Sequence, residues 1–244
     1  MTVFDKSGPV TTGWSPPKDT KLRRRLLYAR YLLKRALLIR GSSDLSTLGN
    51  VSTGCSWTFC TKGLTRDSIV YSGGVGNDIS FEHALVREFG CDVKLFDPST
   101  TALATMSRFE NKIPQFSFFT VGLTGRSRKL RLAPPLDAQE GSWYSSEAAG
   151  AVEVPCIDLG TLLKQNHDQQ IDLLKLDIEG AEYGVLDDIL RDRIPVRQIL
   201  VEFHDGILPG IRLRDSLRVI FRLIARGYRL VAEVGNNHTF IYRS

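Results

Sequence analysis

Acidic residues and one histidine gather just after two apolar segments of the chain. The segments are residues 171–176 and 198–201, and the residues that follow them are Asp177, Glu179, Glu182, Glu202, His204 and Asp205. Carboxylates and an imidazole brought to one place can move a proton to or from a hydroxyl group. We expect His204 or Asp177 to accept such a proton. Glu179 completes this catalytic set and, with Glu202, would orient the hydroxyl, unless His204 is an ordinary loop histidine satisfied by a neighbour.

The same acids offer a second chemistry. Asp177, Glu202 and Asp205 carry the hard oxygen ligands that Mg²⁺ prefers. A bound ion would acidify a coordinated hydroxyl group and so replace the side-chain base. The residue types alone do not separate these two mechanisms, and both stay open.

A glycine-rich turn precedes these acids along the chain. It follows the apolar residues 69–71 and contains Gly74 and Gly76, with Asp78 just before a predicted helix. Glycines permit a tight turn and the close approach of a ligand to backbone amides. The third glycine of the dinucleotide-binding fingerprint is missing, and Asp78 lies directly beside its position. Its carboxylate would repel a pyrophosphate, so the turn favours a cationic ligand, unless Asp78 only caps the helix.

The next apolar segment ends in Asp97, about 20 residues beyond the glycine turn, where an acid can accept hydrogen bonds from ribose hydroxyls. S-adenosylmethionine combines a ribose, an amino acid and a sulfonium and carries no phosphate, so the glycine turn, Asp78 and Asp97 together fit it. The alternative is that Asp97 is a loop acid without a ligand. The residues expected to contact this cofactor are Ser72, Gly73, Gly74, Val75, Gly76, Asp78, Ser80, Asp97, Pro98, Ser99, Val121, Gly122 and Asp177.

Strands and helices alternate from residue 68 to the C-terminus, which predicts an α/β fold with a doubly wound sheet. The predicted strands are residues 68–72, 92–97, 115–121, 171–177, 198–203, 228–234 and 238–243, and the predicted helices are residues 79–89, 100–109, 157–165, 181–191 and 213–226. A tight turn at residues 235–237 makes the last strand an antiparallel edge. Ligands bind at the carboxyl edge of such sheets, so the glycine turn, Asp97 and the acids should meet there. The Ser-, Thr- and Gly-rich segment before residue 68 is expected to be a loop.

Residues 125–152 form a long stretch rich in Gly, Pro and Ser. Loops of this length in compact domains are usually functional, so we expect an excursion over the active site. Trp143 and Tyr144 within it would either stack on a substrate sugar ring or anchor the loop to the core.

The first 45 residues form an N-terminal arm in this interpretation, followed by one domain over residues 46–244. Apolar positions recur at helical spacing over residues 20–39, which predicts a basic amphipathic helix. Residues 18–40 hold nine Lys and Arg against one acid, a net charge of +8, so the rest carries −3 within the overall +5. Because the basic charge belongs to the arm, we expect no nucleic-acid partner. The arm is either a lid or homo-oligomer helix or a peripheral contact with an anionic membrane through residues 18–40.

Charged residues interrupt the apolar positions of the arm, which argues against a secretory signal and a membrane-spanning helix. The four cysteines lack the spacing of a metal or redox pair and are expected to be reduced thiols. We therefore expect a cytoplasmic protein, located at the inner membrane face if the arm binds lipid.

Four segments, residues 71–81, 96–98, 174–182 and 201–204, together resemble the FkbM-type methyltransferases, and the similarity extends over roughly residues 50–244. The resemblance implies a class I, Rossmann-like methyltransferase fold whose seven-stranded sheet ends in an antiparallel strand. It also implies S-adenosylmethionine-dependent methylation of a hydroxyl on a sugar or a polyketide-like natural product. An arm on a membrane would suit a glycolipid acceptor.

Two other function classes remain open. An NAD-dependent oxidoreductase would share the glycine turn and Asp97, but Asp78 and the acids after the fourth strand argue against it. A non-catalytic binding protein that kept the fold is the other, and the retained acids and His204 argue against that.

Overall fold

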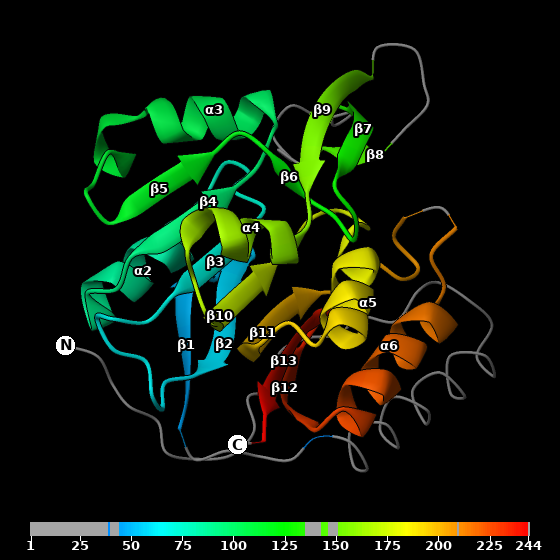
Figure 1. Ribbon diagram of the computed structural model, residues 1–244. Coiled ribbons are helices and arrows are strands. Elements are labelled where there is room, and N and C mark those ends of the chain that lie inside the picture. Colours follow the sequence, from blue (N-terminus) through cyan, green and yellow to red (C-terminus); the bar gives the residue numbers. More distant parts are fainter. Residues whose placement is uncertain (1–38, 40–43, 135–142, 146–150, 209, 244) are drawn as a thin grey trace.

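A seven-stranded sheet forms the centre of the molecule, with helices on both of its faces (Figure 1). The computed structural model describes residue 39 and residues 44–134, 143–145, 151–208 and 210–243. In their order across the sheet, the strands are β12 (Tyr228–Val234), β13 (Asn237–Tyr242), β11 (Val196–Glu202), β10 (Ile171–Leu176), β3 (Val70–Gly73), β4 (Val93–Phe96) and β5 (Phe116–Phe119). Neighbouring strands are parallel except at β13, which is antiparallel to β11 and β12.

This topology confirms the predicted fold class. Each of the seven predicted strands is a strand of the sheet, and the last strand along the chain is the antiparallel one. Val234 pairs with Asn237, so the turn between β12 and β13 consists of Gly235 and Asn236. Gly235 has a φ of 59°, which is the left-handed conformation that two-residue hairpin turns require.

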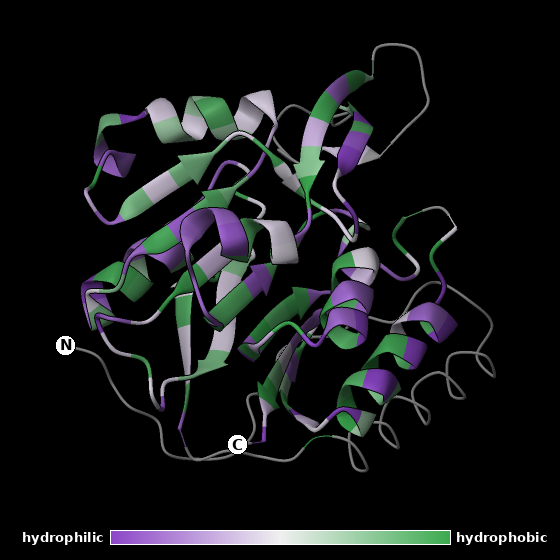
Figure 2. Ribbon diagram, viewed as in Figure 1, coloured by the Kyte–Doolittle hydropathy of each residue, from purple (hydrophilic) through white to green (hydrophobic). Residues whose placement is uncertain are grey.

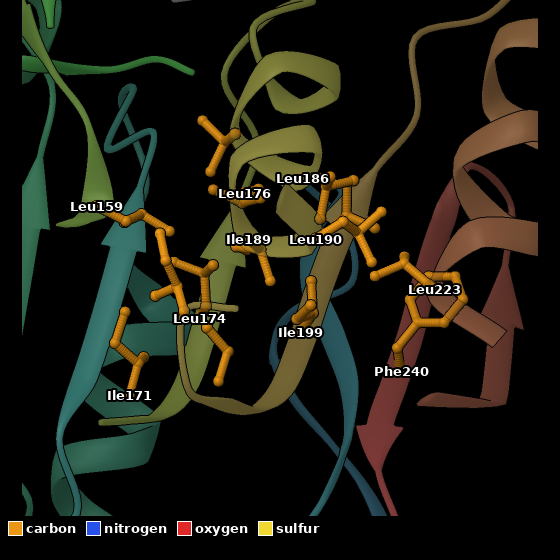
Figure 3. Packing of buried hydrophobic residues seen from close by; sticks show 14 of the residues in the cluster. Leu159, Ile171, Leu174, Leu176, Leu186, Ile189, Leu190, Ile199, Leu223 and Phe240 are labelled. Atoms are coloured by element: carbon orange, nitrogen blue, oxygen red, sulfur yellow. The ribbon is translucent and has the colours of Figure 1, made fainter. Parts of the chain in front are cut away.

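The two faces of the sheet are buried beneath different helices, because alternate residues of a strand point to opposite sides. The helices are α2 (Ser80–Phe89) and α3 (Thr100–Ser107) on one face and α4 (Leu159–Asn166), α5 (Glu182–Asp192) and α6 (Leu213–Ala225) on the other. Each face has its own cluster of buried apolar side chains. Leu173 of β10 packs in the cluster beneath α2 and α3, and Leu174 packs in the second cluster, beneath α4, α5 and α6. Figure 3 shows the second cluster, where Leu190 and Leu223 of the helices meet Ile199 of β11. Hydrophobic colour dominates β10 and β11, whereas α5 and α6 mix both colours as amphipathic helices do (Figure 2).

The loop predicted before residue 68 is wrong, because this segment contains an antiparallel hairpin of β1 (Leu45–Asn50) and β2 (Cys55–Cys60). Phe59 of β2 is fully buried, with its ring 5.7 Å from that of Phe81 on α2. The backbone N–H of Cys60 donates to Oε1 of Gln198 at 2.6 Å. The strand-forming residues Trp57, Thr58 and Phe59 and their burial therefore outweigh the Ser- and Gly-rich composition on which the predicted loop is based.

The predicted excursion forms much of a second, four-stranded sheet. Its strands, in order, are β6 (Gly122–Leu123), β9 (Val152–Ile157), β7 (Arg128–Ala133) and β8 (Tyr144–Ser145). In Figure 1 this small sheet stands beyond the carboxyl end of the central strands. It is thus placed to form a wall of whatever cavity lies at that edge.

The predicted amphipathic helix at residues 20–39 lies outside the described residues, apart from Ile39. Ile39 forms a parallel bridge with Leu230 of β12, the edge strand. The division into an arm of residues 1–45 and a domain of residues 46–244 stays a prediction. Across the described ranges, no helix is both long and apolar enough to span a bilayer.

Candidate active site

The turn between β3 and α2 contains two glycines with positive φ, 87° at Gly74 and 55° at Gly76. A Cβ atom at Gly74 would lie 1.9 Å from the carbonyl oxygen of Asp177. Only glycine allows the turn to pack this closely on the end of β10. At Gly76 a Cβ atom would meet nothing within 4 Å, so this glycine leaves open space beside the backbone.

Asp97 follows β4 and holds the glycine turn in place. Its Oδ2 accepts hydrogen bonds from the backbone N–H groups of Val75 at 2.9 Å and Gly76 at 3.1 Å. Its Oδ1 accepts one from the backbone N–H of Ser99 at 2.8 Å. Because a carboxylate oxygen has two lone pairs, Oδ1 can still accept a hydrogen bond from a ligand hydroxyl.

Asp78 joins the glycine turn to the β1–β2 hairpin. Its Oδ2 accepts from Oγ1 of Thr53 at 2.6 Å, and its Oδ1 accepts from the backbone N–H of Ser80 at 2.7 Å. Burial opposes ionisation, but these hydrogen bonds outweigh burial and hold the pKa of Asp78 below its usual value. The carboxylate therefore stays charged at neutral pH.

A buried lysine lies under the glycine turn, where the sequence predicts no site residue. Nζ of Lys175 is 3.3 Å from Oε1 of Glu82 and donates to the carbonyl oxygen of Gly74 at 2.7 Å. Oγ of Ser72 donates to the same oxygen of Glu82 at 2.6 Å. Burial opposes the charge on Lys175, but attraction to Glu82 and Asp177 outweighs it and raises the pKa of the lysine. The pair is a fixed ionic support for the turn.

The ends of β10 and β11 bring the predicted acids and His204 together. Nε2 of His204 is 3.3 Å from Oε2 of Glu179 and 4.0 Å from Oδ1 of Asp177. Its Nδ1 is 2.9 Å from Oε1 of Glu182. Glu179 has a φ of 50°, an uncommon conformation for a residue with a side chain. The chain therefore bends sharply after β10 where Glu179 meets the imidazole.

Two groups of this cluster hold protons that they would lose in water at neutral or mildly alkaline pH. Burial, followed by repulsion from Asp177, raises the pKa of Glu202 to about 8. Burial would lower the pKa of His204, but its hydrogen bond to Glu182 and the charges of Glu182 and Glu179 raise it to about 9. Such shifts are typical of functional sites, where like charges are brought together out of water.

The glycine turn, Asp78, Asp97, Asp177, Glu179, Glu202 and His204 border one cavity of about 860 Å³ at the carboxyl edge of the sheet, a volume typical of small-molecule sites. The predicted residues that line it are Gly74, Val75, Gly76, Asp78, Asp97, Pro98, Ser99, Gly122, Trp143, Tyr144, Asp177, Glu179, Glu202 and His204. Four predicted cofactor residues do not line it: Ser72 and Gly73 are buried in β3, Ser80 accepts from the backbone of Asn50, and Val121 packs against the core. A direct cofactor contact is therefore not supported for these four residues.

Comparison with known proteins identifies the family. A sequence profile described as the methyltransferase FkbM domain matches residues 70–230 of this chain. The chain belongs to the FkbM methyltransferase family. The match covers the glycine turn, Asp97, both acid-bearing strand ends and the small sheet, and it leaves out the β1–β2 hairpin and β13.

Individual relatives of this FkbM domain are distant. Probable methyltransferase-like protein 24 of Rattus norvegicus is 25% identical over an alignment of 178 residues, and the match covers 70% of this chain and 41% of the rat protein. An rRNA methylase structure from Streptococcus thermophilus is 14% identical with a TM-score of 0.42, covering 74% of this chain and 91% of that chain. A structure of monomeric WbdD is 12% identical, also with a TM-score of 0.42, covering 93% of this chain and 42% of that one. Both structural likenesses are too weak to bear on the function of this chain.

The small sheet gives the FkbM domain an apolar and aromatic wall. Leu130 and Leu132 of β7 line the cavity, together with Trp143 and Tyr144. Nε1 of Trp143 donates to Oγ1 of Thr101 on α3 at 3.1 Å, so the indole is tied to the central domain while facing the cavity. The two roles predicted for this aromatic pair, anchoring the loop and bordering the substrate space, are compatible.

Of the three residues predicted to bind Mg²⁺, Asp177 and Glu202 face each other in the cavity, but Asp205 does not join them. Asp205 accepts a hydrogen bond from Oγ of Ser216 on α6 and is not among the cavity residues in the described ranges. A different set, Asp177, Glu179 and His204, offers ligand atoms within 4.8 Å of one another. In the structure the imidazole of His204 lies against both carboxylates. We assign none of these residues as a metal ligand.

Proposed function

We propose that this FkbM domain is an S-adenosylmethionine-dependent O-methyltransferase that acts on a hydroxyl of a sugar, a glycolipid or a polyketide-like product. The family supplies the reaction class, methyl transfer. The observation that carries the finer proposal is that one cavity contains both a glycine turn held by Asp97 and a histidine held among carboxylates.

The glycine-turn end of the cavity suits the cofactor. The open space at Gly76 lets a ligand approach the backbone, and Oδ1 of Asp97 can accept from a ribose hydroxyl. The carboxyl groups of Asp78 and Asp177 border the same space, and the charge of Asp78 would attract the ammonium and sulfonium charges. When bound, S-adenosylmethionine supplies an electrophilic methyl group on a sulfonium.

The acid-cluster end suits activation of an alcohol. A hydroxyl is a weak nucleophile at neutral pH and needs a group within hydrogen-bond reach that takes its proton. Nε2 of His204, Asp177 and Glu179 border the cavity side by side. With a pKa of about 9, His204 is protonated in the empty cavity at pH 7, so turnover that depends on it as a base should rise toward alkaline pH.

The charge of the cavity supports an uncharged acceptor. Its acidic side chains outnumber its basic ones, Lys175 and His204, and Lys175 is already paired with Glu82. Phosphate or carboxylate groups would be repelled here, which disfavours nucleic acids. A sugar fits both the carboxylates, which accept from hydroxyls, and the face offered by Trp143 and Tyr144.

The direct test is transfer of labelled methyl groups from S-adenosylmethionine into a cell lysate that is afterwards separated into lipid, polysaccharide, protein and nucleic-acid fractions. We expect label in the lipid or polysaccharide fraction, in a base-stable ether. Label confined to protein or nucleic acid would overturn the acceptor class, and cofactor binding without any transfer would favour a non-catalytic binding protein.

The oxidoreductase alternative has its own test. Calorimetric titrations with S-adenosylmethionine and NAD in parallel should give binding only for the first. Binding of NAD alone would overturn the proposed cofactor.

We also propose that an anionic membrane surface is a peripheral partner. The basic segment of residues 18–40 includes Ile39, which forms a bridge with β12, and β12 packs beside α6. Arg212, Arg214 and Arg218 are exposed at the start of α6. Sedimentation with phosphatidylserine vesicles should exceed that with neutral vesicles and weaken with salt, whereas equal sedimentation with both would contradict this partner.

A further inference from the structure

Glu182, in the first turn of α5, is wholly buried, and the sequence places it in the acidic group without indicating a role of its own. Its Oε2 accepts a hydrogen bond from the backbone N–H of Gly180 at 2.8 Å. Its Oε1 is 2.9 Å from Nδ1 of His204. One carboxylate therefore joins the sharp bend after β10 to the imidazole after β11.

This contact determines which ring nitrogen faces the cavity. An ionised carboxylate accepts hydrogen bonds and cannot donate them, so Nδ1 of His204 must carry the hydrogen in the contact with Glu182. The other nitrogen, Nε2, then points toward Glu179 and Asp177. Glu182 is not among the described residues that border the cavity, so it reaches a ligand only through the ring.

We propose that Glu182 is the positioning residue of His204, holding the imidazole by Nδ1 so that Nε2 is the nitrogen presented to the acceptor hydroxyl. In the neutral ring Nε2 is then a lone-pair acceptor for the hydroxyl proton, which moves to it as the C–O bond forms and the C–S bond breaks. The resulting imidazolium is stabilised by the buried carboxylate behind it. What His204 does to the acceptor rests on the proposed function, whereas the orientation of the ring can be measured without turnover.

The charges around His204 come from every element packed against it. Asp177 and Glu179 face it from the bend after β10, Glu182 faces it from α5, and Glu202 faces it from the end of β11. Glu182 is the only one of these carboxylates that bonds to Nδ1. Its charge should therefore influence both the tautomer and the proton affinity of the ring, while the other acids influence the affinity alone.

The experiment is nitrogen-15 NMR of the histidine rings over a pH series in the full chain, with the His204 signals assigned by their loss in His204→Gln. We expect the neutral ring of the wild type to be protonated at Nδ1. In Glu182→Gln the amide oxygen can still accept from Nδ1, so the ring keeps its place, but the pKa of His204 should fall by at least about one unit, a tenfold change in proton affinity.

The matched control is Glu233→Gln. Glu233 lies beside a second buried histidine, with its Oε1 3.4 Å from Nε2 of His238 in the β12–β13 hairpin, and this variant should leave the His204 signals unchanged. A wild-type ring protonated at Nε2, or an unchanged pKa in Glu182→Gln, would overturn the proposal, and the wild-type measurement decides even if the variant fails to fold. In turnover assays Glu182→Gln should shift the pH profile of kcat with KM for the cofactor unchanged. Absence of methyl transfer by a wild type with the expected tautomer would count against the proposed function and not against this orientation.

Discussion

The two ends of the cavity use the same residue types in opposite ways. At the glycine turn, each acid has hydrogen-bond donors of its own: Asp97 has three backbone N–H groups, and Glu82 has Lys175 and a serine hydroxyl. At the ends of β10 and β11, Asp177, Glu202 and their neighbours face one another. Hydrogen bonds to Thr53 and Ser80 hold the pKa of Asp78 below its usual value, whereas burial and repulsion from Asp177 raise the pKa of Glu202 to about 8.

This difference separates binding from chemistry. A fixed negative charge attracts a cationic ligand without changing its own state, and so suits the cofactor end. A group with a pKa of about 8 or 9, such as Glu202 or His204, can exchange a proton near physiological pH and so suits the reacting end. Substitutions at each end of the cavity test this division.

The largest effect is expected at Lys175, which supports the glycine turn. Lys175→Met would leave Glu82 buried and without its cation, and such a loss typically costs about 3–5 kcal/mol of folding free energy. Urea unfolding followed by circular dichroism measures the loss. The double variant Lys175→Met, Glu82→Gln should recover much of the stability, because no uncompensated charge remains. A single variant as stable as the wild type would show that this end of the cavity does not depend on its ion pair.

The second effect concerns turnover at the other end. His204→Gln should lower kcat by about 10² or more, the usual contribution of a positioned acid or base, while the affinity for S-adenosylmethionine stays within about twofold. Radiolabel transfer and calorimetry measure the two quantities. His83→Gln is the matched control, because His83 bonds to Asn111 away from the cavity and its loss should change neither quantity. If His204→Gln lowered cofactor affinity by as large a factor as kcat, His204 would serve cofactor binding as well as chemistry, and the two ends would not be functionally separate.

The sequence predicts the central sheet well, and also the meeting of the glycine turn with Asp97 at its edge, for a physical reason. Apolar strands, glycines with positive φ and an acid at a strand end are local signals, and Gly74, Gly76 and Asp97 meet because parallel strands end at one edge. In the hairpin at residues 45–60 the local signal is weak, because Trp57, Thr58 and Phe59 stand among Ser, Thr and Gly residues. Its strands exist because Trp57 and Phe59 pack on α2 and the sheet, which no short window of sequence encodes.

Which residues of the site pair with one another is harder to predict than which residues belong to the site. Lys175 lies in an otherwise apolar strand and Glu82 between the buried Phe81 and Leu85 of α2, and each alone signals a buried charge that needs a partner. The sequence does not say that they pair with each other across 93 positions of chain. Likewise the acidic run after β10 does not reveal that Glu182 points to His204 while Asp205, after β11, turns to α6.

The third prediction is a pH dependence of stability. The folded pKa of Glu202 is raised from 4.5 to about 8, and that of His204 from 6.5 to about 9. Each raised pKa gives stability that is fully present below the unfolded value and is lost as pH rises through the folded value, so the free energy of unfolding should fall between about pH 5 and 9. One such group contributes a slope of at most about 1.4 kcal/mol per pH unit.

Glu202→Gln isolates the contribution of Glu202 to the pH dependence of stability, because the amide keeps the shape of the side chain and cannot ionise. The variant should gain about 1–2 kcal/mol over the wild type at pH 9 and little at pH 5, as measured by urea unfolding across the series. Glu153→Gln, at an exposed pair with Lys129, should leave the slope unchanged. A wild type whose free energy of unfolding rises toward pH 9 would mean that the folded structure does not raise the pKa values of these groups.

The smallest effect is expected at Asp97, where an amide can replace part of what the carboxylate does. In Asp97→Asn the remaining oxygen can still accept from the backbone of the glycine turn, but the NH₂ group cannot accept from a ribose hydroxyl. We expect cofactor affinity to fall by about tenfold, or ~1.4 kcal/mol, with kcat at saturating cofactor within about twofold of the wild type. Calorimetry and saturation kinetics check both values, and Asp92→Asn, at an exposed position before β4, should match the wild type. The division between the two ends requires that Asp97→Asn lowers cofactor affinity and that His204→Gln lowers kcat. A loss of kcat alone in Asp97→Asn would therefore mean that the glycine-turn end also takes part in the chemistry.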